Sequence, residues 1–158
     1  MKKLLIIREA ATEDVEEIFR LLELYSPQGI VLPRSREDIT FFISNFTVAI
    51  CDGKLCGCVA VRDFGNDLLE VRSLVVSPEY QGSGIGRAMI ASIIEKLKVS
   101  RKDWRLFALT LQVDFFCKIG FREVPKSLFP EKIWSDCSRC EKRHCCDETA
   151  MLMEAEDI

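Results

Sequence analysis

A strand, a glycine-rich loop and an amphipathic helix follow one another between Leu68 and Leu97. The strand-like run 68–76 ends at Ser77-Pro78, and residues 81–86 read Gln-Gly-Ser-Gly-Ile-Gly. Glycines let a backbone approach an anion closely, and a helix start presents unpaired N–H groups with a partial positive charge. The segment therefore predicts a cradle for a diphosphate. The helix itself is expected from an apolar stripe at helical spacing, formed by Ile85, Met89, Ile93 and Leu97.

Three phosphate-binding patterns compete for this loop. A Walker loop requires Gly-Lys-Ser/Thr after its spacer, and that sequence is missing here. A dinucleotide-binding fold requires G-x-G-x-x-G early in a parallel sheet, whereas these glycines are spaced differently and follow hairpin-like sequence. The third pattern is Q/R-x-x-G-x-G/A, which is matched by Gln81, Gly84 and Gly86. A helix start that binds no ligand stays open as the purely structural alternative.

The other segments indicate a mixed α and β fold in a single domain covering residues 1–158, because this length suits one core. Asp52-Gly53 is typical of a hairpin turn between two strands. Besides the run 68–76, we expect strands at 4–8, 47–51, 54–62, 105–109, 121–124 and 149–154. Besides the helix after the glycine loop, we expect helices at 12–25, after residue 35 and at 112–119. A Cys-rich insert at 125–148 should precede the last strand.

Two helix starts carry capping signals. Thr12 is expected to cap the first helix, with Glu13 and Asp14 placed favourably in its first turn. Ser35 and Asp38 resemble a capping box at the second helix. That second helix is expected to turn four apolar side chains inward, Ile39, Phe42, Ile43 and Phe46.

With Val-x-Pro-x-Tyr at 76–80 before the loop and Phe-Cys-Lys-Ile-Gly-Phe at 116–121 after it, the chain resembles the GCN5-related N-acetyltransferase (GNAT) family. The resemblance covers the whole length and implies a mixed, mostly antiparallel sheet flanked by helices. It also implies acetyl-CoA as co-substrate. Loop amides would bind the CoA pyrophosphate, and the strand before the loop would pair with the pantetheine arm. The residues so implied are Leu74, Val75, Val76, Gln81, Gly82, Ser83, Gly84, Ile85, Gly86 and Arg87.

Direct acyl transfer requires a base for the amine, a group that polarises the thioester oxygen, and a stabilised leaving thiolate. The resemblance makes Glu70 the base, with a solvent-facing strand glutamate as its alternative. It also implies that the N–H of Leu74 or Val75 polarises the carbonyl. Many members use a tyrosine as acid where this chain has Phe116, and a phenyl ring donates no proton. No acid is therefore assigned.

Three further stretches resemble the acetyltransferase domain of N-acetylglutamate synthases, at 28–37, 107–110 and 132–151. This resemblance implies transfer of acetyl to the α-amine of L-glutamate, the opening step of arginine synthesis, and a homodimer. Arginine binds carboxylates in a bidentate manner, so Arg34 is the first substrate-binding candidate. Arg36, Arg72 and Thr110 are further candidates. Glutamine, another small amine or a protein N-terminus as acceptor, and a non-catalytic acyl-CoA sensor, stay open.

The eight cysteines fall into two groups. Those at 51, 56, 58 and 117 are expected to be reduced and to pack as small hydrophobes. A tail cluster contains Cys137, Cys140, Cys145 and Cys146 near His144, which suits free thiols, a disulfide or zinc. We commit to no metal, because only one Cys-x-x-Cys pair is present.

Charge and hydropathy limit the partners. A net charge of −3 and a pI of about 5.3 disfavour nucleic-acid binding. No run approaches the roughly 18 apolar residues of a membrane span, and the apolar run near the N-terminus is too short for a signal peptide. We therefore expect a cytoplasmic enzyme that acts on a small molecule, with no nucleic-acid or membrane partner.

Overall fold

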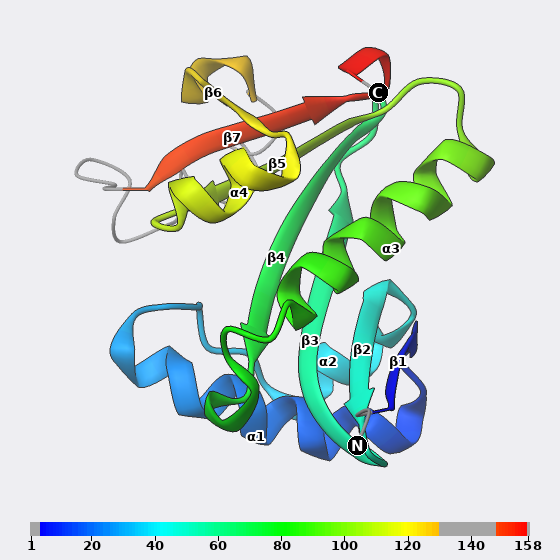
Figure 1. Ribbon diagram of the computed structural model, residues 1–158, viewed down its shortest axis with the longest axis vertical. Coiled ribbons are helices and arrows are strands. Elements are labelled where there is room, and N and C mark those ends of the chain that lie inside the picture. The colour runs from blue at the N-terminus through cyan, green and yellow to red at the C-terminus, as the bar shows by residue number, and fades with distance from the viewer. Residues whose placement is uncertain (1–3, 130–147, 158) are drawn as a thin grey trace. The chain divides into compact units, whose positions relative to one another are not determined.

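The computed structural model describes residues 4–129 and 148–157, and it has a mixed α+β fold (Figure 1). The seven strands hydrogen-bond in the order β1-β2-β3-β4-β5-β7-β6. The β1–β2, β2–β3, β5–β7 and β6–β7 pairs are antiparallel, and β4–β5 is parallel. The expected mostly antiparallel fold class is thus confirmed. The strands are β1 (Leu5–Glu9), β2 (Phe46–Cys51), β3 (Lys54–Asp63), β4 (Leu68–Val76), β5 (Arg105–Thr110), β6 (Arg122–Val124) and β7 (Thr149–Glu154). The α-helices are α1 (Val15–Tyr25), α2 (Arg36–Phe41), α3 (Ile85–Ser100) and α4 (Val113–Ile119).

The chain forms two compact units. One contains residues 1–61 and 71–100, with helices α1 to α3 and the end of β4. The other contains residues 62–70 and 101–158, with β5 to β7, α4 and the start of β4. The expectation of a single domain stays a prediction.

In the first unit, α1 and α2 pack on one face of β2 and β3. Ile18, Leu22, Ile39, Phe46 and Val48 are each no more than 1% exposed and share one core. They lie together because helix residues three and four apart share a face, as do alternate residues of a strand. The burial of Ile18 and Leu22 thus follows from helical periodicity on α1.

The helix starts differ in detail from the expected ones. Thr12 is the first residue of a short 3-10 turn, Thr12–Asp14, and the N-cap position of α1 is Asp14, so the Thr12 prediction is wrong. Asp14 accepts hydrogen bonds from the Ala11 N–H at 2.7 Å and from both guanidinium NH groups of Arg8 at 2.7 and 3.1 Å. Three N–H groups donated to a carboxylate stabilise this turn more than one hydrogen bond to the Thr12 hydroxyl would.

The second helix is shorter than expected. Ser35 Oγ accepts the Asp38 N–H at 3.0 Å, which confirms the Ser35 half of the capping box, whereas the Asp38 carboxylate accepts the Arg34 Nε–H, and α2 ends at Phe41. Ile39 is fully buried within it, whereas Phe42 is 37% exposed and lies beyond the helix. Phe46 is buried, but it belongs to β2. A 3-10 turn at Ile43–Asn45 breaks the helical spacing from which four inward residues were predicted.

The second unit has its own aromatic core. The Phe107 and Phe129 rings stack with centroids 4.1 Å apart, and Leu68, Ala150 and Leu152 pack around them. Strand β5 pairs along its whole length with β7, and α4 ends at Ile119, directly before Gly120, which has a φ of 123°. The start of β4 pairs in parallel with β5 of this strand pair.

We predict that Asp14→Asn lowers the Tm by a few degrees near neutral pH. The hydrogen bonds from Arg8 hold the pKa of the Asp14 carboxyl below its ordinary value. Such a carboxyl stabilises the fold above its unfolded-state pKa, and it loses this contribution as the pH falls through its folded-state pKa. The Tm difference between wild type and variant, followed by calorimetry from pH 7 downward, should therefore shrink below about pH 4.

Glu95→Gln is the matched control, because Glu95 pairs with Lys98 only on the exposed face of α3. It should change the Tm little. A Tm difference for Asp14→Asn that stays constant down to pH 2 would contradict the assigned role of this carboxylate.

Candidate active site

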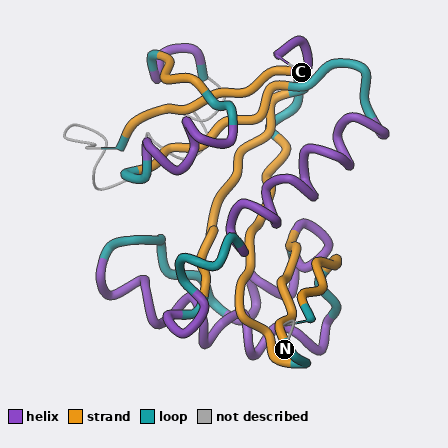
Figure 2. Tube along the Cα trace, viewed as in Figure 1, coloured by secondary structure: helices purple, strands orange, loops and turns teal. Residues whose placement is uncertain are grey.

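The glycine loop connects the end of β4 to the start of α3 (Figure 2). Gly82 and Gly84 have φ of 79° and 83°, a left-handed conformation that glycine adopts at little cost. At neither position would a Cβ meet a heavy atom within 4 Å, so this side of the loop is open. The first intrahelical bond runs from the Ala88 N–H to the Gly84 carbonyl at 3.0 Å. The N–H groups of residues 85–87 precede it and lack helical acceptors, which suits an anion.

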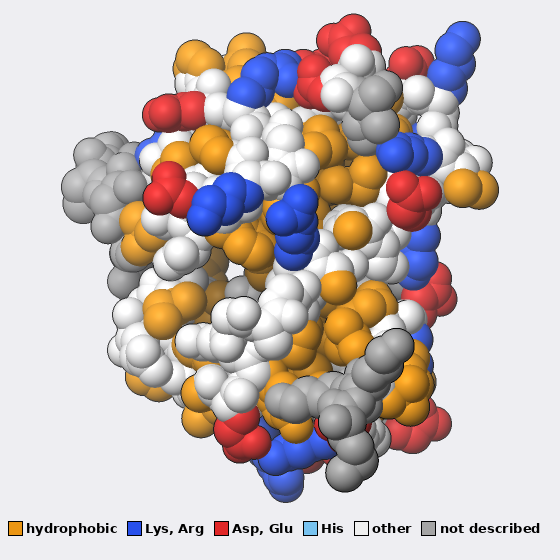
Figure 3. Space-filling model, in the orientation of Figure 1, with side chains coloured by type: hydrophobic (Ala, Val, Ile, Leu, Met, Phe, Trp, Pro, Cys, Tyr) orange, Lys and Arg blue, Asp and Glu red, His pale blue; other side chains and the backbone are white. Residues whose placement is uncertain are grey.

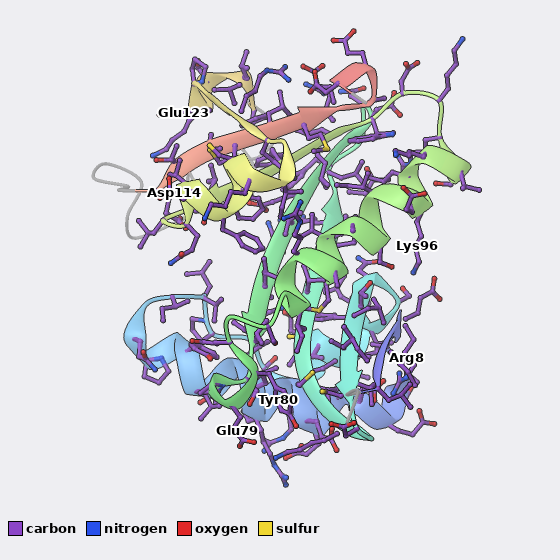
Figure 4. All side chains as sticks on the ribbon, in the orientation of Figure 1. Arg8, Glu79, Tyr80, Lys96, Asp114 and Glu123 are labelled. Atoms are coloured by element: carbon purple, nitrogen blue, oxygen red, sulfur yellow. The ribbon has the colours of Figure 1, made fainter. Side chains whose placement is uncertain are left out.

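Polar side chains of the loop stabilise the loop itself. The Ser83 hydroxyl donates to the Tyr80 carbonyl. The Gln81 side-chain amide donates to the Tyr25 hydroxyl at 2.7 Å and lies 3.4 Å from the Val76 carbonyl. The side chains of Gln81 and Ser83 are therefore already hydrogen-bonded. If these two residues bind the diphosphate as predicted, they would do so through their backbone N–H groups. Figure 4 labels their neighbours Glu79 and Tyr80 in this loop.

Gly57 of β3 allows α3 to lie close to the sheet. A Cβ at this position would come within 3.0 Å of the Met89 side chain, 3.2 Å of the Val75 carbonyl oxygen and 3.4 Å of the Ile85 side chain. The contact with the Val75 carbonyl oxygen is the critical one, because a backbone atom yields less easily than the flexible end of Met89. The position of the helix start beside the end of β4 thus depends on a glycine outside the loop.

The end of β4 is irregular at Ser73, which has a φ of 55°. A β-strand residue other than glycine rarely adopts this conformation, and such strain gathers at functional sites. The Cys58 thiol lies 3.6 Å from the Ser73 carbonyl, and the Tyr25 hydroxyl donates to the Val76 carbonyl at 2.5 Å. The predicted pantetheine-binding stretch 74–76 therefore begins directly after a distortion and ends at a carbonyl already in use.

Arg34 is held in place by four neighbours. Its Nε donates to Asp38 Oδ2 at 2.6 Å, and its Nη1 lies 3.5 Å from Ser73 Oγ. The guanidinium carbon lies 4.9 Å from the ring centre of Phe46 and 5.8 Å from that of Phe42, and the side chain is 12% exposed. A guanidinium has five N–H donors, so it can still bind a carboxylate.

The other predicted substrate residues have partners of their own. Arg36 donates to both oxygens of Glu16, at 2.7 and 3.1 Å, and covers the Phe19 ring, so it ties α2 to α1. Arg72 is half-buried in β4. Thr110 ends β5, and its hydroxyl accepts the Gln112 N–H at 2.8 Å.

Glu70 is only 3% exposed and lies opposite Phe107 in the parallel β4–β5 pair. The alternative of a solvent-facing glutamate is therefore wrong. Phe116 is also buried, and its ring meets those of Phe115 and Phe121 edge-on at 5.1 and 5.0 Å. It packs within the second unit and offers no proton.

The described cysteines are free thiols. Cys51, Cys56 and Cys58 are buried as expected, and burial raises the pKa of Cys56 to about 11 and of Cys58 to about 12, so neither is a thiolate nucleophile at neutral pH. Cys117 is exposed, so the prediction that it packs inward is wrong, because α4 buries Phe116 instead. The tail cluster, Cys137, Cys140, His144, Cys145 and Cys146, lies outside the described residues.

Metal ligands, membrane-spanning helices and surface charge can be assessed over the described residues. Within 4–129 and 148–157, no three His, Cys, Asp or Glu side chains gather as a metal site would require. None of the helices in those ranges has the length and apolar character to span a bilayer. On the face drawn in Figure 3, acidic and basic side chains are interspersed, in line with the small net charge.

Two residues at the end of β4 and beside the loop have structural roles that the sequence does not predict. The sequence places Tyr25 at the end of the first helix, and its hydrogen bonds with Val76 and Gln81 depend on tertiary packing. The sequence places Ser73 in a regular strand, whereas its φ is 55°. The only available signal for Tyr25 was a phenol on the buried face of an amphipathic helix, since a buried tyrosine hydroxyl usually finds a hydrogen-bond partner.

Comparisons with known proteins agree with this geometry. Residues 42–123 match the model of the acetyltransferase (GNAT) domain. An uncharacterized N-acetyltransferase of Chlorobaculum tepidum is 40% identical over 146 residues, which cover 92% of this chain and 94% of that protein. An amino-acid acetyltransferase of Neisseria meningitidis is 37% identical over 79% of this chain, but the match spans only 29% of that longer protein.

The solved structure of N-acetylglutamate synthase from Neisseria gonorrhoeae, complexed with coenzyme A and N-acetyl-glutamate, resembles the chain with a TM-score of 0.83. It is 30% identical, and the match covers 98% of this chain and 36% of that one. A Mycobacterium tuberculosis protein in complex with CoA has a TM-score of 0.77 and 28% identity, and the match covers 94% of this chain and 98% of that one. With an open, glycine-bounded helix start of the kind that binds a diphosphate, this chain belongs to the GNAT acetyltransferase family and is an acetyl-CoA-dependent enzyme.

Proposed function

We propose that this chain transfers the acetyl group of acetyl-CoA to the α-amine of L-glutamate and so makes N-acetyl-L-glutamate. The observation that carries the proposal is the likeness, over 98% of the chain, to a synthase structure complexed with coenzyme A and N-acetyl-glutamate. The match spans only 36% of that protein, so the synthase activity is a proposal for this chain. We further propose a cytoplasmic homodimer that serves arginine synthesis.

Backbone groups carry the CoA half of the proposed reaction. The amides of residues 81–87 would bind the diphosphate, since the loop is open at Gly82 and Gly84 and the first helical turn has unpaired donors. The backbone of residues 74–76 would align the pantetheine arm. The N–H of Leu74 or Val75 would then donate to the thioester oxygen as negative charge develops on it.

Glu70 supplies the proposed base. It accepts a proton from the ammonium of the acceptor, directly or through a water, and the free amine attacks the thioester carbon. The carbon–sulfur bond breaks, the nitrogen of the adduct loses its second proton to solvent, and the leaving thiolate takes a proton from solvent, because Phe116 has none to give. The burial of Glu70 supports this role, since a carboxylate shielded from water attracts a cation more strongly than an exposed carboxylate does.

Arg34 supplies the proposed acceptor recognition. Its guanidinium is fixed by Asp38, Ser73 and the Phe46 ring before any ligand binds, so little side-chain entropy is lost when a carboxylate arrives. Arg72 and Thr110 stand as further contributors. Arg36 is the weakest candidate, because Glu16 already takes its guanidinium.

The acceptor is tested by measuring thiol release from acetyl-CoA with a panel of amino acids and amines. We expect turnover with L-glutamate, weaker turnover with L-glutamine, and none with amines that lack an α-carboxylate. Strong turnover on a non-acidic amine with none on glutamate or glutamine would refute the proposed acceptor. Binding of CoA without turnover on any amine would instead identify a sensor.

Glu70→Gln should lower kcat about 100-fold near neutral pH, because general-base catalysis typically contributes at least that factor. Part of the activity should return at high pH, where more of the amine is already deprotonated. The measurement is the pH–rate profile of both enzymes at saturating substrates. An unchanged profile in the variant would exclude Glu70 as the base.

Arg34→Ala should raise the KM for glutamate about 10- to 100-fold with a smaller change in kcat, because it removes a charge-assisted contact made before the transition state. Arg34→Lys should recover only part of the loss, since an ammonium cannot bind a carboxylate in a bidentate manner. The matched control is Arg20→Ala, an exposed arginine of α1. A KM for glutamate that stays within two-fold of wild type in Arg34→Ala would end the assignment.

A further inference from the structure

The Tyr25 hydroxyl joins the two ends of the segment that precedes the glycine loop. It donates to the carbonyl of Val76, the last residue of β4, at 2.5 Å. It accepts the side-chain amide of Gln81 at 2.7 Å, and Gln81 directly precedes the first left-handed glycine. Tyr25 is 7% exposed, and burial raises its pKa, so the hydroxyl keeps its proton and both hydrogen bonds at physiological pH.

Local hydrogen bonds fix the segment between those two ends. The Tyr80 N–H donates to the Ser77 carbonyl at 2.9 Å, and the Ser77 N–H donates to the Cys56 carbonyl of β3 at 2.7 Å. The Ser83 hydroxyl continues the series onto the Tyr80 carbonyl. Tyr25 is the member of this network that comes from α1, some fifty residues away in sequence. It therefore anchors the base of the loop to the core that α1 shares with β2 and β3.

We propose that Tyr25 is a positioning residue of the acetyl-CoA site, whose hydroxyl, through Val76 and Gln81, sets the conformation in which amides 82–87 receive the diphosphate. Tyr25 itself makes no contact with CoA in this role. A loop already held in its binding conformation loses less conformational entropy when the ligand arrives, so the network increases affinity without adding a contact.

The direction of the hydroxyl proton supports positioning over chemistry. The hydroxyl hydrogen is donated to the Val76 carbonyl, and the hydroxyl oxygen accepts the Gln81 amide. A proton donor to the leaving thiolate would need that hydrogen free. The proposal depends only on CoA binding by this family and not on glutamate as the acceptor, so it can fail or succeed separately from the proposed function.

Tyr25→Phe tests the proposal, because it removes the hydroxyl and keeps the ring in its core. The dissociation constant of coenzyme A, measured by calorimetry, should rise about three- to ten-fold, the loss expected for one or two hydrogen bonds. The KM for acetyl-CoA should rise in parallel, while kcat at saturating acetyl-CoA stays within about two-fold. An unchanged dissociation constant, or a fall in kcat with an unchanged KM for acetyl-CoA, would overturn the proposal.

Gln81→Met approaches the same network from its other end and keeps the length of the side chain. It should also weaken CoA binding, and in this background Tyr25→Phe should cost less than it does in the wild type, because the two residues share a hydrogen bond. Strictly additive losses would contradict the shared network. If Tyr25→Phe does not fold, Gln81→Met decides alone, since unchanged CoA affinity in that variant would refute the proposal.

Asp14→Asn is the matched structural control. Asp14 lies at the N-terminal end of the same helix, opposite Tyr25, where it pairs with Arg8, and Figure 4 shows Arg8 well apart from Tyr80 of the loop. This variant should lower the Tm and leave the dissociation constant of coenzyme A within two-fold of wild type. Weakening of CoA binding as large as in Tyr25→Phe would mean that loosening of α1 alone is responsible, and positioning by the hydroxyl would be rejected.

Discussion

Unpaired backbone N–H groups at the start of α3 determine what the surrounding structure must provide. They bind an anion only if the loop before them turns outward and the helix start stays where the strand ends. Left-handed Gly82 and Gly84 meet the first need, and the absence of a side chain at Gly57 meets the second by letting α3 lie against β3. The hydrogen bonds of Tyr25 add a third element, which links the base of the loop to the core under α1.

The packed core also fixes Arg34, the arginine proposed to bind the acceptor. Arg34 lies against Phe46 and is paired with Asp38, so its guanidinium is ordered by the same core that holds α1 and α2. Ser73 contributes both the distortion of β4 and an oxygen close to Arg34. The irregular residue of β4 is thus shared by the two halves of the proposed chemistry, the stretch expected to align the thioester and the arginine expected to bind the acceptor.

Sequence patterns located nearly all of the helices and strands, because each pattern reflects the periodicity of the local backbone. The stripe from Ile85 to Leu97 is buried on α3, and the run 68–76 coincides with β4, since helical and strand periodicity follow directly from backbone geometry. Patterns were less reliable where tertiary context decides. The helix after Ser35 ends after six residues because the chain must turn into β2, and Cys117 is exposed because α4 buries the aromatic residue beside it.

The site shows the same division. The loop and its glycines were recognisable because the chemistry requires those residue types at that spacing, whereas the sequence left the burial of Glu70 open. The left-handed conformation of Ser73 and the contacts of Tyr25 have no local cause.

A measurement of backbone amide resonances of residues 82–87 by NMR, during titration with coenzyme A and with pantetheine, tests the central claim most directly. The account predicts large shifts of these resonances with coenzyme A and small ones with pantetheine, which has no phosphate. Saturable binding of coenzyme A that leaves these amides unchanged would contradict it.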